Sequence, residues 1–289
     1  SDDYAVLFLQ GGASQQFYML PMNLLQPGVT ADYVHSGSWA KKAIAEAKLF
    51  GDVNVAADTS KDSPARMPAA NELKLTDGAR YLHLTSNETI AGTQWKTFPH
   101  VDAPLVADMS SDILSRPVDV SPFGLIYAGA QKNLGPAGVT LVIVRKDFVA
   151  DANADIPSFL QYKLQIEKDS MVNTPPTFSV YLLKLVTDWL LEQGGVAAMA
   201  EINARKAAKL YDAIDATDFY RGTAEPASRS TMNVTFRLPE EDLEAEFLKD
   251  AAAEGLDALK GHRSVGGIRA SIYNAMPEAG VDALVRFMK

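Results

Sequence analysis

Lys132 is the residue of this chain whose type and setting point most directly to chemistry. It lies in the small-residue segment YAGAQKNLGPAG, between the apolar runs 123–128 and 139–144. A buried lysine has a lowered pKa, so its amine can act as a base or form a Schiff base with an aldehyde. A surface lysine in a loop is the ordinary alternative for a lysine considered alone. The interpretation therefore depends on the residues that could accompany it.

Two features could bring partners to this amine. Asp108 follows the apolar run 105–107, and open α/β sheets bind ligands at the carboxyl ends of their strands. A carboxylate there could keep a pyridine nitrogen protonated, which makes the ring an electron sink. An aspartate that caps a turn is an equally ordinary alternative. The segment FLQGGASQQF places Gly11 and Gly12 before a helix, a geometry that suits phosphate and that also serves many plain turns.

Aromatic and basic side chains add two further candidates. Trp39 stands at a predicted helix start, where its flat face could stack on a cofactor ring or simply pack in the core. His262, Arg263 and Arg269 lie in the glycine-rich segment GHRSVGGIR of an otherwise acidic chain. Arginine binds carboxylate and phosphate through two parallel hydrogen bonds, so this segment predicts anion binding, with a solvated loop as the alternative.

The elements that must position these residues follow an α/β pattern. Short apolar runs alternate with helix-like segments in the first half, which favours a mostly parallel sheet. Ser14 and Ser38 are expected to cap helices that extend to about Leu25 and Phe50. After Pro175-Pro176 the pattern changes to long helices with few strands. The sequence predicts a large α/β domain over residues 1–190 and a smaller α+β domain over 191–289. The predicted strands are 4–9, 32–35, 53–56, 81–84, 105–107, 125–128, 139–144, 232–236 and 267–272, and the later helices are 177–192, 197–217, 240–254 and 277–288.

Composition excludes several classes of function. The 289 residues include no cysteine, which excludes disulfides, thiolate metal sites and cysteine nucleophiles and is typical of a reducing cytoplasm. The net charge of −9 makes a nucleic-acid partner unexpected. No apolar run approaches the roughly 18 residues of a membrane span. The four histidines lack metal-ligand spacing, so no metal is expected.

Together these motifs resemble the phosphoserine aminotransferases, which are class-V, fold-type I (aspartate aminotransferase-like) enzymes that use pyridoxal 5'-phosphate. The resemblance runs from Tyr4 to the end of the chain. It implies a large domain with a mostly parallel seven-stranded sheet and a small C-terminal α+β domain. The segments that carry the resemblance are FLQGGASQQF, TSNETIAGTQW, VADMSSDILSRPVDV, FGLIYAGAQKNLGPAGVTLVIVRKD, NTPPTF and HRSVGGIRASIYNAMP.

The resemblance also implies a role for each matching residue. Lys132 would form the Schiff base with the cofactor and Asp108 would pair with its ring nitrogen. His262 and Arg263 would bind the substrate phosphate, and Arg269 the α-carboxylate. Asn173 and Thr174 would reach the cofactor phosphate of a partner subunit, because the family's sites are shared across a homodimer. The cofactor-binding set as a whole would be Ala13, Ser14, Trp39, Thr89, Asp108, Ser110, Gln131, Lys132, Asn173 and Thr174.

The implied reaction interconverts 3-phosphohydroxypyruvate and L-glutamate with O-phospho-L-serine and 2-oxoglutarate, in serine biosynthesis. The related phosphohydroxythreonine reaction of the pyridoxine pathway is also implied. The cofactor motifs alone leave an alanine–glyoxylate type aminotransferase open. Family members have several dozen residues before the strand that begins here at Tyr4, including a His-Arg pair, whereas no His or Arg precedes His35. A truncated chain is therefore expected, and a cofactor-binding but inactive protein is the remaining alternative.

Overall fold

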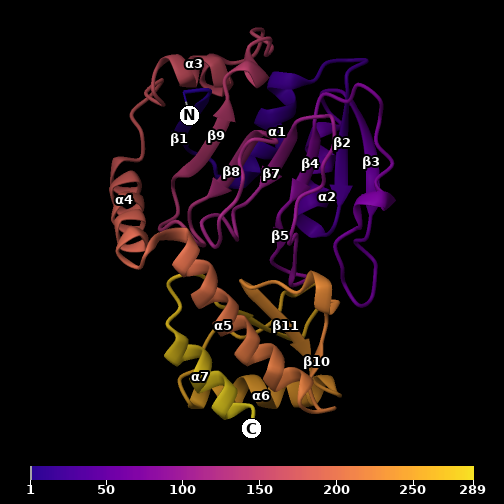
Figure 1. Ribbon diagram of the computed structural model, residues 1–289, viewed down its shortest axis with the longest axis vertical. Helices are drawn as coiled ribbons and strands as arrows, with labels where there is room; N and C mark the ends of the chain where they lie inside the picture. Colours follow the sequence, from indigo (N-terminus) through magenta and orange to yellow (C-terminus); the bar gives the residue numbers. More distant parts are fainter. Residues whose placement is uncertain (1) are drawn as a thin grey trace.

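A seven-stranded sheet forms the larger part of the protein, the upper part of Figure 1. The computed structural model describes residues 2–289. The strands β7, β4, β2 and β3 follow β8 in parallel, whereas β9 runs antiparallel to both of its neighbours, β8 and β1. The predicted mostly parallel sheet is thus confirmed. In sheet order the strands are β1 (Tyr4–Leu9), β9 (Thr140–Arg145), β8 (Phe123–Gly129), β7 (Leu105–Asp108), β4 (Leu82–Thr85), β2 (Thr30–His35) and β3 (Asp52–Asp58).

Helices cover this sheet because its central strands are apolar on both faces. All seven residues of β8 are buried, as expected for a strand between two packed layers. One apolar core contains Phe17, Tyr33 and Tyr127, and the other contains Trp95, Ile126 and Leu183. The helices of this part are α1 (Gly12–Leu24), α2 (Ser38–Ala47), α3 (Tyr162–Glu167) and α4 (Thr177–Glu192), with 3-10 turns at Ala70–Glu72, Asp147–Val149 and Ser158–Leu160.

The C-terminal part has its own sheet and its own core, below the large sheet in Figure 1. Three antiparallel strands pack against helices through Leu210, Phe236 and Leu284. Because the two cores are separate, we propose domain limits at 1–190 and 191–289. The elements are α5 (Gly195–Asp215), β10 (Arg221–Gly222), a 3-10 turn (Pro226–Ser228), β11 (Asn233–Arg237), α6 (Glu241–Ala253), β12 (Ile268–Ser271) and α7 (Glu278–Phe287).

A short buried hairpin joins the two parts. It consists of β5 (Asn87–Glu88) and β6 (Thr93–Gln94). The Asn87 amide donates to Asn233 Oδ1 at 2.8 Å, and Ser230 Oγ donates to Asn87 Oδ1 at 2.5 Å. The hairpin was absent from the predicted elements because its strands are polar and only two residues long. Its bonds hold the small sheet against the edge where β4 and β7 end.

Two predicted helix caps are wrong. α1 begins at Gly12, after a left-handed Gly11 with φ 83°, so Ser14 lies inside the helix. α2 begins at Ser38 after Gly37, and no side chain of the capping residue bonds its first turn. A glycine, not a serine, stands directly before each helix. The backbone there has either a left-handed conformation or a close contact, and neither favours a larger residue. No helix of residues 2–289 is long and apolar enough to cross a bilayer.

Candidate active site

Lys132 lies in the connection between β8 and β9, at the edge of the sheet where β4 and β7 also end. The connection is closed by the pairing of Gly129 with Thr140. The Lys132 amine donates to Thr89 Oγ1 at 2.9 Å and lies 5.3 Å from the centre of the Trp39 ring. Three predicted residues from three separate segments therefore meet at one nitrogen atom.

The surroundings of this nitrogen favour its neutral form. Burial lowers the pKa of Lys132 below its ordinary value, because desolvation penalises the charged amine. The carboxylates of Asp108 and Glu88 oppose this shift, and the Arg269 guanidinium adds to it. A buried amine with a lowered pKa can serve as both nucleophile and base near neutral pH.

Asp108 ends β7 as expected and is buried. Its Oδ1 accepts hydrogen bonds from the backbone N–H of Ser110 at 3.0 Å and from Ser110 Oγ at 2.6 Å. Burial raises the pKa of Asp108, and these bonds together with the nearby Lys132 partly offset the rise. Among the described residues all bonds to this carboxylate end on Oδ1, so Oδ2 is left for a ligand. Ser110 thus orients Asp108.

The N-terminus of α1 provides the third element of the site. Its first N–H groups have no side-chain cap, and a Cβ on Gly12 would meet nothing within 4 Å. Uncapped N–H groups beside open space fit an anionic phosphate. Ala13 and Ser14 lie in this first turn, and Gln131 lies exposed beside Lys132 in the chain. Together with Lys132 and Asp108, this end of the sheet fits pyridoxal phosphate.

Only part of the basic segment GHRSVGGIR lines a cavity next to the site of Lys132. A cavity of about 700 Å³ between the domains is lined by His262 and Arg269, with Ile90 and Ala91 from the hairpin. Arg269 Nε is buried without a hydrogen-bond partner among residues 2–289, so it can receive a carboxylate. Arg263 is exposed and does not line this cavity.

Asn173 and Thr174 are exposed in the segment before α4. Asn173 exchanges two amide hydrogen bonds with Gln10, at 3.2 and 3.3 Å. Gln10 precedes the Gly11 turn, so Asn173 contacts the loop that leads into the N-terminus of α1 of its own chain. No hydrogen bond joins Asn173 or Thr174 to Lys132 within the described part of the chain.

Two site residues have no predicted role in the sequence. Glu88 is completely buried, and burial raises its pKa to about 7. Tyr273 shares hydrogen bonds with Asn233 and Thr89, which extends the Lys132 contact into the small domain. The one sequence feature that could have indicated Glu88 as a site residue is its position beside Thr89 in the segment SNETI. Its burial could not be read from its type, because a carboxylate is normally exposed.

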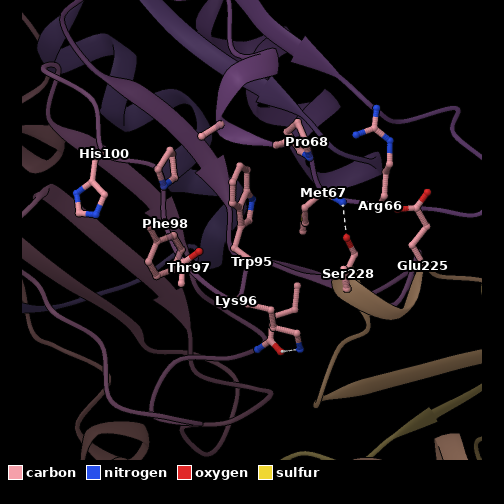
Figure 2. Close-up of a pocket in the computed structure, with 15 residues that line it drawn as sticks. Arg66, Met67, Pro68, Trp95, Lys96, Thr97, Phe98, His100, Glu225 and Ser228 are labelled. Atoms are coloured by element: carbon pink, nitrogen blue, oxygen red, sulfur yellow. Dashed lines mark hydrogen bonds between the residues drawn. The ribbon is translucent and has the colours of Figure 1, made fainter.

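A second cavity between the domains, of about 620 Å³, is separate from this site (Figure 2). It is lined by Trp95, Phe98 and Met67 and closed by a 3.0 Å bond from the Met67 N–H to Ser228 Oγ. The Arg66 guanidinium at its rim is already paired with Glu72 and Asp62. None of the predicted site residues lines this cavity, so it does not contribute to the chemistry of Lys132.

Comparison with known proteins agrees with this geometry. Curated relatives include the phosphoserine aminotransferases of Niallia circulans, 55% identical over 288 residues, and Desulfosudis oleivorans, 57% identical over 291 residues. These matches cover 99% and 100% of this chain and 80% of each relative.

Solved structures give the same result. A phosphoserine aminotransferase from Bacillus circulans subsp. alkalophilus superposes with a TM-score of 0.95 at 53% identity, covering 100% of this chain and 80% of that one. A pyridoxal phosphate-bound phosphoserine aminotransferase from Trichomonas vaginalis gives a TM-score of 0.95 at 40% identity, covering 100% and 83%. The fold is therefore that of the fold-type I enzymes. The class-V aminotransferase profile matches residues 1–284, and the chain belongs to the class-V aminotransferase family.

Proposed function

We propose that this protein is a pyridoxal phosphate-dependent phosphoserine transaminase. It interconverts 3-phosphohydroxypyruvate and L-glutamate with O-phospho-L-serine and 2-oxoglutarate. The observation that carries the proposal is the meeting of Lys132 with Thr89 and Trp39 beside Asp108, in a chain more than half identical to proteins of that name. The related phosphohydroxythreonine reaction is an amino-group transfer of the same kind and is part of the proposal.

The site residues divide the work on the cofactor. The first N–H groups of α1 at Ala13 and Ser14, with Gln131, would hold the phosphate, and Trp39 would stack on the ring. Thr89 and the Asp108 carboxylate would hold the ring hydroxyl and the ring nitrogen, and Lys132 would hold the cofactor through its amine. When bound, the cofactor would supply the electron sink.

The chain's own groups move the proton and orient the substrate. Burial lowers the pKa of Lys132, which favours the neutral form of the amine that would accept the proton from the substrate Cα and later return it. Arg269, with its unpartnered Nε, holds the α-carboxylate. His262 and Arg263 bind the substrate phosphate, and the place of His262 in the cavity of Arg269 supports this role.

We further propose a homodimer with shared sites. The segment of Asn173 and Thr174 is exposed and is flanked by the apolar side chains of Met171, 64% exposed, and Phe178, 72% exposed. Exposed apolar groups of this size around polar side chains are typical of a contact surface. A partner subunit would cover this segment and receive Asn173 and Thr174 at its cofactor phosphate. The cytoplasmic location expected from the cysteine-free sequence stays a prediction.

Three measurements test the two proposals. Lys132→Ala is expected to abolish both turnover and the visible absorbance of the lysine–cofactor Schiff base, and a variant that keeps both contradicts the assignment. The wild-type protein is expected to transaminate phosphoserine far faster than serine or alanine. Equal rates would favour an alanine–glyoxylate type aminotransferase. A sizing column run at several protein concentrations tests the dimer.

A further inference from the structure

Helix α2 begins without a capping side chain of its own. Gly37 occupies the capping position and Ser38, the first helical residue, makes no cap bond. The first N–H groups of a helix need acceptors when they are buried. Here a distant residue supplies one, because Glu88 Oε1 accepts the backbone N–H of Ala40 at 3.3 Å. The backbone N–H of Trp39 also faces this carboxylate and lowers its pKa, against the larger rise that burial causes.

The fit between Glu88 and this helix start is close. A Cβ on Gly37 would lie 2.7 Å from the Glu88 carboxyl carbon. Ser36 Oγ also donates to Oε1, at 3.3 Å, while Oε2 is buried without a hydrogen-bond partner among residues 2–289. An unpaired buried carboxylate oxygen destabilises the fold. Strongly perturbed carboxylates of this kind cluster at functional sites, so we expect Glu88 to serve the site.

The helix start that Glu88 holds also carries Trp39. The centre of the Trp39 ring lies 5.3 Å from the Lys132 amine, which would hold the cofactor under the proposed function. From this arrangement we infer that Glu88 is a positioning residue: it caps α2 from the neighbouring hairpin and thereby fixes Trp39 against the bound cofactor. The inference rests on the proposed function, because it presumes that a pyridine ring binds under Trp39.

The charges that face Glu88 belong to Lys132 and Asp108. Removal of the carboxylate therefore has two separable effects. It releases the start of α2, and it removes a negative charge near Lys132. Glu88→Gln removes the charge and keeps an acceptor for the Trp39 and Ala40 N–H groups, whereas Glu88→Ala removes both.

The first experiment measures pyridoxal phosphate binding by purified variants, with the circular dichroism band induced in the bound cofactor. Loss of a helix cap is expected to weaken binding about tenfold in Glu88→Ala and to reduce the induced band, which reports a ring held in one orientation. Glu88→Gln is expected to restore both. Ser38→Ala is the matched control and is expected to change neither. A merely structural role would lower the melting temperature of Glu88→Ala and leave affinity and band intact, which would overturn the inference.

A second pair of variants tests the geometry even if Glu88→Ala folds poorly. Gly37 has extended backbone, φ 168°, so alanine is tolerated there except for its contact with Glu88. Gly37→Ala is expected to weaken cofactor binding about as much as Glu88→Ala, and the double variant to be no weaker than either. Additive losses would contradict the inference. Absence of any cofactor binding by the wild-type protein would instead refute the proposed function.

Discussion

The ionisation of Glu88 gives a prediction that is independent of cofactor. Burial raises the pKa of Glu88 from 4.5 to about 7. The native chain therefore keeps a proton that the unfolded chain has lost, and the resulting stabilisation is complete below pH 4.5 and lost as pH rises through 7. A shift of this size corresponds to about 3 kcal/mol, at roughly 1.4 kcal/mol for each pH unit. Glu88→Gln does not titrate, so it escapes this loss.

Urea unfolding of the cofactor-free protein between pH 4.5 and 8 measures this effect. The free energy of unfolding of Glu88→Gln is expected to rise relative to wild type by about 3 kcal/mol across that range. Glu72→Gln is the control, because the Arg66 guanidinium lowers the pKa of Glu72 to about 2. Its difference from wild type should therefore stay constant above pH 4.5. Parallel curves for wild type and Glu88→Gln would refute the reasoning.

Three further predictions concern the site itself. Asp108→Asn keeps the shape of the side chain and removes its charge, so kcat is expected to fall about 100-fold or more with cofactor still bound; an unchanged kcat in steady-state assays would contradict the role. Gly11→Ala places a Cβ 2.1 Å from a neighbouring side chain at φ +83°, so it should lower the melting temperature and weaken cofactor binding. Gly78→Ala, at φ +70° with open space around it, should show the backbone strain alone. Thr89→Val removes an acceptor that favours the charged amine, so the pKa of Lys132, read from the pH dependence of its labelling by an aldehyde reagent, should fall further, whereas Thr89→Ser should restore it.

The sequence predicts the sheet well because its central strands are buried on both faces. Apolar runs such as those of β8 and β9 mark a strand whatever lies beside them. The same local signals predict Lys132 and Asp108, since each follows or ends such a run. The direction of β9, which runs antiparallel in an otherwise parallel sheet, could not be predicted from local sequence. Strand direction depends on which strands become neighbours.

The residues that sequence reasoning missed depend on contacts between distant segments. Glu88 resembles a surface carboxylate until Gly37 and the start of α2 close over it. The hairpin of β5 and β6 is polar because its partners are polar groups of the small domain, such as Asn233. Arg263 is exposed outside the cavity that His262 lines, and its predicted role in binding the substrate phosphate stays a prediction.

The antiparallel pairing of β8 with β9 has a consequence for the order of folding. The two strands are consecutive in sequence, and their connection closes with a 3.1 Å bond from the Ala130 N–H to the Val139 carbonyl. Contacts between segments close in sequence form fastest, because they close the smallest loops. The backbone that carries Lys132 can therefore take its shape before β1, the first strand of the chain, joins its edge of the sheet. We therefore expect the backbone around Lys132 to form as a local unit, before the distant segments that carry its partners pack against it.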